Sequence, residues 1–134
     1  MTPKAFISYS WSNPSHEQWV ISLAGELRES GVDVMLDKWD LKEGDDAHAY
    51  MEQMVTNPEI TKVVMVCDKI YAEKANRRSG GVGTETQIIT PELYGNQSQN
   101  KFVAVISELD EGGNGYVPVF YKSRIYIDMS DFAK

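Results

Sequence analysis

The chain has 134 residues, of which 42% are hydrophobic and 25% are charged, values typical of one soluble globular domain with a single core. Its 13 basic and 20 acidic residues give a net charge of −7. Non-specific nucleic-acid binding needs a basic face, so we expect no nucleic-acid partner.

Three sequence features indicate a cytoplasmic protein. No apolar run approaches the roughly 20 residues of a membrane span, so we expect no membrane partner. Met1 to Lys4 lead directly into a strand pattern, so we expect no signal peptide. The single cysteine, Cys67, excludes a disulfide within the chain and closes an apolar run, which favours a buried, inert thiol in a reducing cytosol.

Hydrophobic periodicity predicts the elements of the first part of the chain. A strand over Ala5–Tyr9 precedes a helix that opens near Ser15, which has capping-box spacing to Gln18. Gly31 is predicted to cap the end of this helix. A second strand is predicted over Val32–Leu36.

The middle of the chain begins with a predicted polar loop from Asp37 to Asp46. A helix with one apolar face follows, and Asn57–Pro58 is predicted to stop it. Lys62–Cys67 is the most continuously apolar segment and is predicted to be the third strand.

A second long loop is predicted from Asp68 to Glu85. Thr84 has capping-box spacing to Gln87, which predicts a helix start there. Two more strands are predicted, over Lys101–Ile106 and Arg124–Ile127. Alternating strands and helices predict a single α/β domain over residues 1–134, with a flavodoxin-like, open, five-stranded parallel sheet flanked by helices.

In open sheets of this kind, ligands bind beyond the carboxyl ends of the strands. Three predicted loops meet there: Ser10–Ser12, Asp37–Asp46 and Asp68–Glu85. The chain has neither a Walker loop nor a G-x-G-x-x-G motif after its first strand, which disfavours a P-loop NTPase or a Rossmann dehydrogenase.

The third loop contains the most informative stretch, Gly80–Gln87, with three glycines in four residues followed by the carboxylate of Glu85. Glycine lets backbone approach a ligand closely, although a plain surface loop has the same composition. Lys74, Arg77 and Arg78 lie just upstream, either as pyrophosphate ligands or as a solvated cationic cluster.

Several motifs occur in the order expected of one superfamily. The chain resembles TIR-type domains, and most closely their SEFIR branch, in five segments: Lys4–Trp11, Val34–Asp45, Tyr71–Ala75, Gly80–Glu85 and Ser123–Asp128. The resemblance implies the TIR fold and cleavage of NAD⁺ by the assembled domain, with one glutamate, here Glu85, carrying the chemistry. It also implies a C-terminal cyclic-nucleotide sensor, of STING or SAVED type, in a longer anti-phage protein.

One departure from the family concerns an aromatic residue about one helical turn before the glutamate, because that position is Gly81 here. Trp39, Trp11 or Tyr9 must then stack on nicotinamide. The residues that we expect to bind NAD⁺ are Tyr9, Ser10, Trp11, Asp37, Trp39, Asp45, Arg77, Gly81 and Gly83. Helix capping explains Asp45 as well, because either Asp45 or Asp46 can cap the next helix.

The resemblance also implies self-association through the loop after the second strand, with Trp39, Leu41, Lys42 and Gly44 as the interface residues. Three roles are open for the Trp39 side chain: stacking on a base or nicotinamide, burial against a neighbouring copy, or packing back over the sheet edge.

The nicotinamide group of NAD⁺ is cationic while it is bonded to the ribose and leaves as a neutral molecule, so its departure requires no general acid. One carboxylate can both bind the ribose and oppose the positive charge that develops on it. Glu85 is therefore sufficient without cofactor or metal, and Glu92 is the second candidate. A glutamate in a first helical turn can also serve the helix dipole alone. The alternative function is a non-enzymatic adaptor that acts through homotypic TIR or SEFIR contacts.

Overall fold

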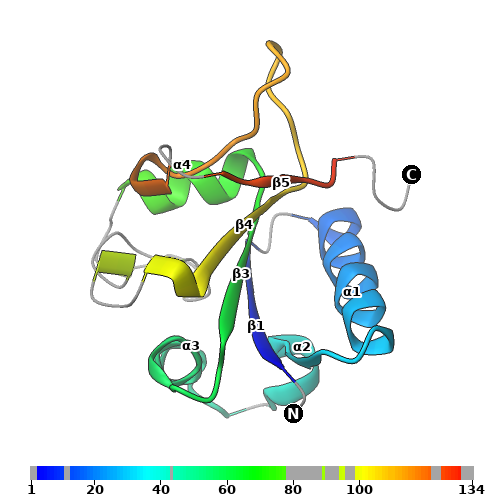
Figure 1. Cartoon of the computed structure of the whole chain (residues 1–134), viewed down its shortest axis with the longest axis vertical. Helices are drawn as coiled ribbons and strands as arrows, with labels where there is room; N and C mark the ends of the chain where they lie inside the picture. The colour runs from blue at the N-terminus through cyan, green and yellow to red at the C-terminus, as the bar shows by residue number, and fades with distance from the viewer. Residues whose placement is uncertain are drawn as a thin grey trace.

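The computed structural model describes residues 3–10, 13–42, 44–77, 89, 94–95, 99–121 and 125–130. Five parallel strands form one sheet in the order β2-β1-β3-β4-β5 (Figure 1). The strands are β1 (Lys4–Tyr9), β2 (Asp33–Met35), β3 (Lys62–Cys67), β4 (Phe102–Ile106) and β5 (Ile127–Asp128). The predicted open, parallel α/β sheet is confirmed.

Four α-helices and two short 3₁₀ helices connect the strands within the described residues. They are α1 (Pro14–Glu29), α2 (Asp37–Asp40), α3 (Ala47–Thr56), α4 (Lys69–Arg77), η1 (Gln99–Lys101) and η2 (Val119–Tyr121). In Figure 1, α1 lies on one side of the sheet, and α3 and α4 lie on the other. Each helix in the described ranges is too short or too polar to span a bilayer.

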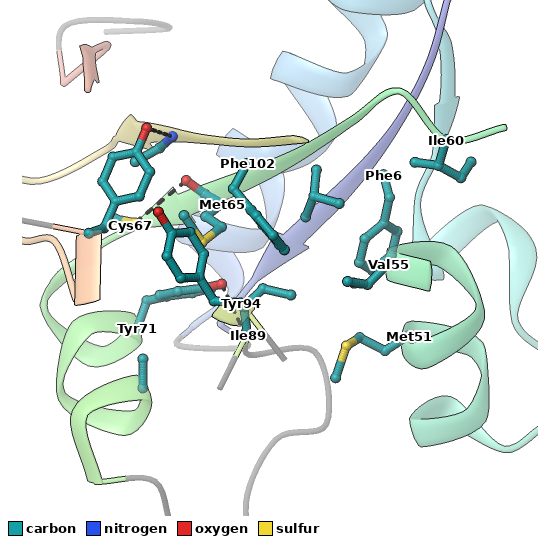
Figure 2. Close-up of a cluster of buried hydrophobic side chains, with 14 of the residues drawn as sticks. Phe6, Met51, Val55, Ile60, Met65, Cys67, Tyr71, Ile89, Tyr94 and Phe102 are labelled. Carbon is teal, nitrogen blue, oxygen red and sulfur yellow. Dashed lines mark hydrogen bonds between the residues drawn. The ribbon is translucent and has the colours of Figure 1, made fainter. Parts of the chain in front are cut away.

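Each face of the sheet has its own buried cluster. On the α1 face, Val20, Leu23 and Ala24 of the helix pack with side chains of β1 and β2. The larger cluster on the α3 and α4 face contains Phe6, Met51, Val55, Ile60, Val63, Met65, Cys67, Tyr71, Ala75, Ile89, Tyr94, Phe102, Ala104, Ile106 and Tyr121, most of them drawn in Figure 2. Burial on both faces explains why the β3 sequence is almost continuously apolar.

Helix α1 begins two residues earlier than a cap at Ser15 predicts. Asn13 is the N-cap, because its side-chain oxygen accepts a hydrogen bond from the backbone N–H of His16 at 2.9 Å. Pro14 fits the first helical position, where no N–H is needed. Gly31, with φ of 97°, follows the helix end as predicted.

Two helices lie where loops were predicted. Helix α2 occupies the first residues of the predicted Asp37–Asp46 loop. Helix α4 occupies much of the predicted Asp68–Glu85 loop, because Asp68 caps it by accepting the backbone N–H of Tyr71 at 2.8 Å. The helix predicted from Thr84 lies outside the described residues.

The strand ends also differ from the predictions. Strand β2 is confined to three residues and β4 begins one residue later than predicted. Strand β5 is only Ile127–Asp128, since pairing with Val105 and Ile106 of β4 defines it, and Ile125 is exposed outside the ladder.

Candidate functional site

The carboxyl end of β1 is a row of buried polar side chains. Ser8, Tyr9 and Ser10 have no exposed surface. The Tyr9 hydroxyl donates a hydrogen bond to Oδ1 of Asp37 at 2.7 Å. The same oxygen accepts the backbone N–H of Lys38 at 2.8 Å, and Asp37 is only 6% exposed. The structure therefore brings Tyr9 and Asp37 of the predicted site into direct contact.

Helix α2 is held from two sides. The ammonium group of Lys38 lies 2.6 Å from Oε1 of Glu17 on α1, and this hydrogen bond raises the pKa of Lys38. Oδ2 of Asp40 accepts hydrogen bonds from the backbone N–H of Leu36 and from the hydroxyl of Tyr50. These contacts fix the orientation in which α2 presents Trp39.

Trp39 on α2 is 38% accessible. The guanidinium carbon of Arg28 on α1 lies 4.3 Å from the ring centroid, a cation–π distance. Arg28 therefore covers one face of the ring and leaves part of the rest open. Tyr9 is fully buried, so Trp39 is the only one of the two described stacking candidates with an exposed ring.

The segment after α2 forms a tight exposed turn. The carboxylate of Asp45 accepts the backbone N–H of Lys42 at 2.8 Å, and Gly44 has φ of 91°, a conformation that favours glycine. Leu41 is partly buried, whereas Lys42, Gly44 and Asp45 are exposed. Asp46, rather than Asp45, caps α3 through the N–H of Ala49.

The remaining predicted residues cannot be placed. Trp11, Gly81, Gly83, Glu85 and Glu92 lie outside the described residues. Arg77 ends α4, but its side chain also lies outside what the structure describes. Their roles stay predictions.

Sequence reasoning missed a second polar group at the same edge of the sheet. Oγ of Ser8 and the hydroxyl of Tyr71 lie 2.8 Å apart, and the Tyr71 oxygen also accepts the backbone N–H of Ile89 at 3.2 Å. Both Tyr71 and Ile89 are fully buried, and burial raises the pKa of the Tyr71 phenol above its ordinary value.

His16 and Asp68 belong to this edge as well. Nε2 of His16 lies 3.8 Å from Oδ2 of Asp68, and both side chains are about nine-tenths buried. The sequence signal that could have located Asp68 and Tyr71 was their spacing, which is typical of a helix N-cap. Within the described residues, no group of three metal-ligating side chains gathers anywhere.

The architecture defines a TIR-like α/β domain. The TIR domain of the Toll-related receptor TRR-2 from Hydra magnipapillata matches with a TM-score of 0.63 and 16% identity, over 95% of this chain and 84% of that one. The TIR domains of the activated Roq1 resistosome match with a TM-score of 0.56 and 20% identity, over 90% of this chain and 69% of that one. At these identities, the matches establish the fold.

The family follows from the sequence. A SEFIR-domain family model matches residues 3–130, and the chain belongs to the SEFIR family. The crystal structure of a prokaryotic SEFIR domain is 46% identical, with a TM-score of 0.77, over 92% of this chain and 79% of that one. A search of curated proteins found no match.

Proposed function

We propose that this SEFIR domain cleaves the bond between nicotinamide and ribose in NAD⁺ when several copies assemble, with Glu85 as the catalytic carboxylate. The observation that carries the proposal is the polar carboxyl edge of the sheet, where Tyr9 and Asp37 are hydrogen-bonded and the neighbouring Ser8 of β1 is also buried. Ligands of open parallel sheets bind at this edge.

The order of residues along the chain supports the proposed role of Glu85. Helix α4 follows β3 and ends at Arg77, three residues before Gly80, and Ile89 is again fixed at the carboxyl edge beside Ser8 and Tyr71. Glu85 comes four residues before Ile89 in the sequence, and this proximity along the chain supports assigning it to a site at this edge.

The proposed reaction is a glycoside hydrolysis. The C1′–N bond breaks with both electrons going to nicotinamide, which leaves neutral, and the ribose develops oxocarbenium character. The carboxylate of Glu85 opposes this positive charge and accepts hydrogen bonds from the ribose hydroxyls. Water then adds to C1′ and loses one proton, giving ADP-ribose, nicotinamide and H⁺. Attack by another part of the substrate in place of water would give a cyclic product.

The proposed surface for assembly is α2 and the turn that follows it. Trp39 is partly exposed, Lys42 and Gly44 are exposed beside it, and Lys38 and Arg28 hold the helix in place. A fixed, exposed aromatic is the kind of side chain that dominates protein interfaces. We propose that Trp39 contacts a neighbouring copy and helps to complete that copy's NAD⁺ site.

The wider context rests on the resemblance to bacterial effector modules. We propose a cytoplasmic anti-phage effector whose longer protein carries a C-terminal cyclic-nucleotide sensor, so that binding of a second messenger drives assembly. Depletion of NAD⁺ would then stop the infected cell. The 46% identity to a prokaryotic SEFIR domain is consistent with a bacterial setting.

The test of the proposed function is nicotinamide release from NAD⁺ by protein that has been concentrated or artificially clustered. Glu85→Gln keeps the shape of the side chain and removes its charge, and it should slow release by about 10²-fold or more. Glu59→Gln is the matched control: Glu59 pairs with Lys4 near the amino end of the sheet and should be dispensable.

Two results would count against the proposal. Glu85→Gln with wild-type turnover would transfer the catalytic role to Glu92 as the next candidate. A clustered wild type that releases no nicotinamide would leave the non-enzymatic adaptor as the function of the domain.

A further inference from the structure

Tyr71 is fixed at both of its ends. Its backbone N–H donates to Oδ1 of Asp68 at 2.8 Å, which caps the start of α4. Its hydroxyl lies 2.8 Å from Oγ of Ser8, which is fully buried on β1. A side chain held by a helix cap and by the central part of the sheet has little freedom to move.

The hydroxyl has one further partner, the backbone N–H of Ile89 at 3.2 Å. Ile89 belongs to the large buried cluster, and Figure 2 shows Tyr71 reaching from α4 toward it. This backbone position lies 18 residues from Tyr71 along the chain and four residues after Glu85. The tyrosine thus ties the backbone at Ile89 to β1.

We propose that Tyr71 is a positioning residue, whose hydroxyl anchors the backbone at Ile89 against Ser8 and thereby supports catalysis by Glu85, four residues earlier in the sequence. The inference rests on the proposed function and deepens it. Tyr71 itself touches no substrate in this account. It acts through the backbone that carries the carboxylate.

The expected consequence follows from the geometry. Tyr71→Phe keeps the ring in the core but leaves a buried backbone N–H without its acceptor, so the chain near Ile89 must shift or open. Small misplacements of a catalytic group can lower turnover by about 10²-fold. Because the interaction with the transition state is lost and ground-state contacts elsewhere are kept, kcat should fall and KM should change little.

The chain provides a matched control in Tyr121. Its hydroxyl also bridges two segments of backbone, accepting the N–H of Ala104 at 3.2 Å and donating to the carbonyl of Ile125 at 3.1 Å. Tyr121 is 3% exposed, so Tyr121→Phe removes equivalent bonds from an equally buried ring at β4. Loss of stability alone would affect both variants.

The experiment measures two quantities in wild type, Tyr71→Phe and Tyr121→Phe: steady-state nicotinamide release, and hydrogen exchange at the Ile89 and Met65 amides. We expect kcat of Tyr71→Phe to fall about tenfold or more with KM within about threefold. Exchange at Ile89 should accelerate about tenfold or more, whereas Met65 in β3 keeps its protection. Tyr121→Phe should retain kcat within about twofold and leave Ile89 protected.

Equal losses of kcat in the two variants would overturn the proposal, as would unchanged Ile89 exchange in Tyr71→Phe. The exchange measurement needs no activity, so it separates this inference from the proposed function. If the wild type releases no nicotinamide, the proposed function fails, and Ile89 exchange alone then decides whether the anchor exists.

Discussion

The hydroxyl of Tyr9 and Oδ1 of Asp37 lie 2.7 Å apart across 28 residues of sequence. The bond joins the last residue of β1 to the first residue of α2, and both side chains are buried. Because Trp39 belongs to the same short helix, the position of the proposed interface depends on a contact made inside the carboxyl edge of the sheet.

Removing the Tyr9 hydroxyl should therefore lower the free energy of unfolding. Tyr9→Phe leaves the buried Asp37 carboxylate without one of its donors, and the free energy of unfolding should fall by about 1–3 kcal/mol in urea titrations. Tyr50→Phe is the matched control, since it removes a similar tyrosine–aspartate bond, to Asp40, in an exposed setting. Its cost should be smaller, and equal costs would contradict the importance that we assign to the Tyr9–Asp37 bond.

Trp39→Ala should weaken both self-association and NAD⁺ cleavage without unfolding the monomer. Removing an aromatic residue from the centre of an interface often costs 2 kcal/mol or more, roughly a 30-fold change in the dissociation constant. Sedimentation velocity over a concentration series provides the measurement. Ile125→Ala is the control, because Ile125 is 93% exposed and lies outside the proposed interface. Equal association of wild type and Trp39→Ala would exclude Trp39 from the interface.

Alkaline pH should destabilise the fold through Cys67. Burial raises the pKa of its thiol above the ordinary value of 9.0. Below pH 9 the thiol is protonated in both the folded and the unfolded chain, so its contribution to stability is fully present. As pH rises above 9, only the unfolded chain ionises, and the free energy of unfolding should fall by up to about 1.4 kcal/mol per pH unit.

The partly buried phenol of Tyr50 and the fully buried phenol of Tyr71 act in the same direction from about pH 10, since burial raises the pKa of both. Urea unfolding of wild type and Cys67→Ala at pH 8, 9, 9.5 and 10 separates the two effects. The variant starts from a lower stability because of its cavity, but its pH slope between 9 and 10 should be flatter. Parallel slopes would show that Cys67 does not contribute.

The sequence predicted the sheet well because its strands are short apolar runs that read clearly from composition. Lys62–Cys67 was predicted with its observed bounds, since burial on both faces leaves few choices of residue. The bounds of strand β5 were predicted wrongly. This edge strand has only two residues, and its pairing register with β4 defines it, rather than its own hydrophobic pattern.

The short helices were harder to predict from the sequence. Helix α2 has four residues, too few for a 3.6-residue period to appear, and its four positions include three charged side chains. Among the described side chains of α4, only Tyr71, Ala72 and Ala75 are buried, so the apolar face is narrow. Local pattern favours a loop in both cases, while long-range contacts make a helix.

The meeting of Tyr9 and Asp37 could be predicted from the sequence, but the hydrogen bonds that these residues and their neighbours make could not. Tyr9 and Asp37 were expected at the same edge, because the carboxyl ends of β1 and β2 meet there. Their hydrogen bond, and the link from Ser8 through Tyr71 to Ile89, join residues far apart in sequence, and no local pattern encodes such pairs.

The central claim, that the working NAD⁺ site needs more than one chain, is tested most directly by specific activity against protein concentration. Nicotinamide release per mole of protein is measured from nanomolar to high micromolar concentration, with light scattering on the same samples. The account predicts low activity from monomer at low micromolar concentration and a total rate that climbs faster than linearly as assemblies form. Constant specific activity over the whole range, without self-association, would show that one chain holds a complete site and would contradict the account.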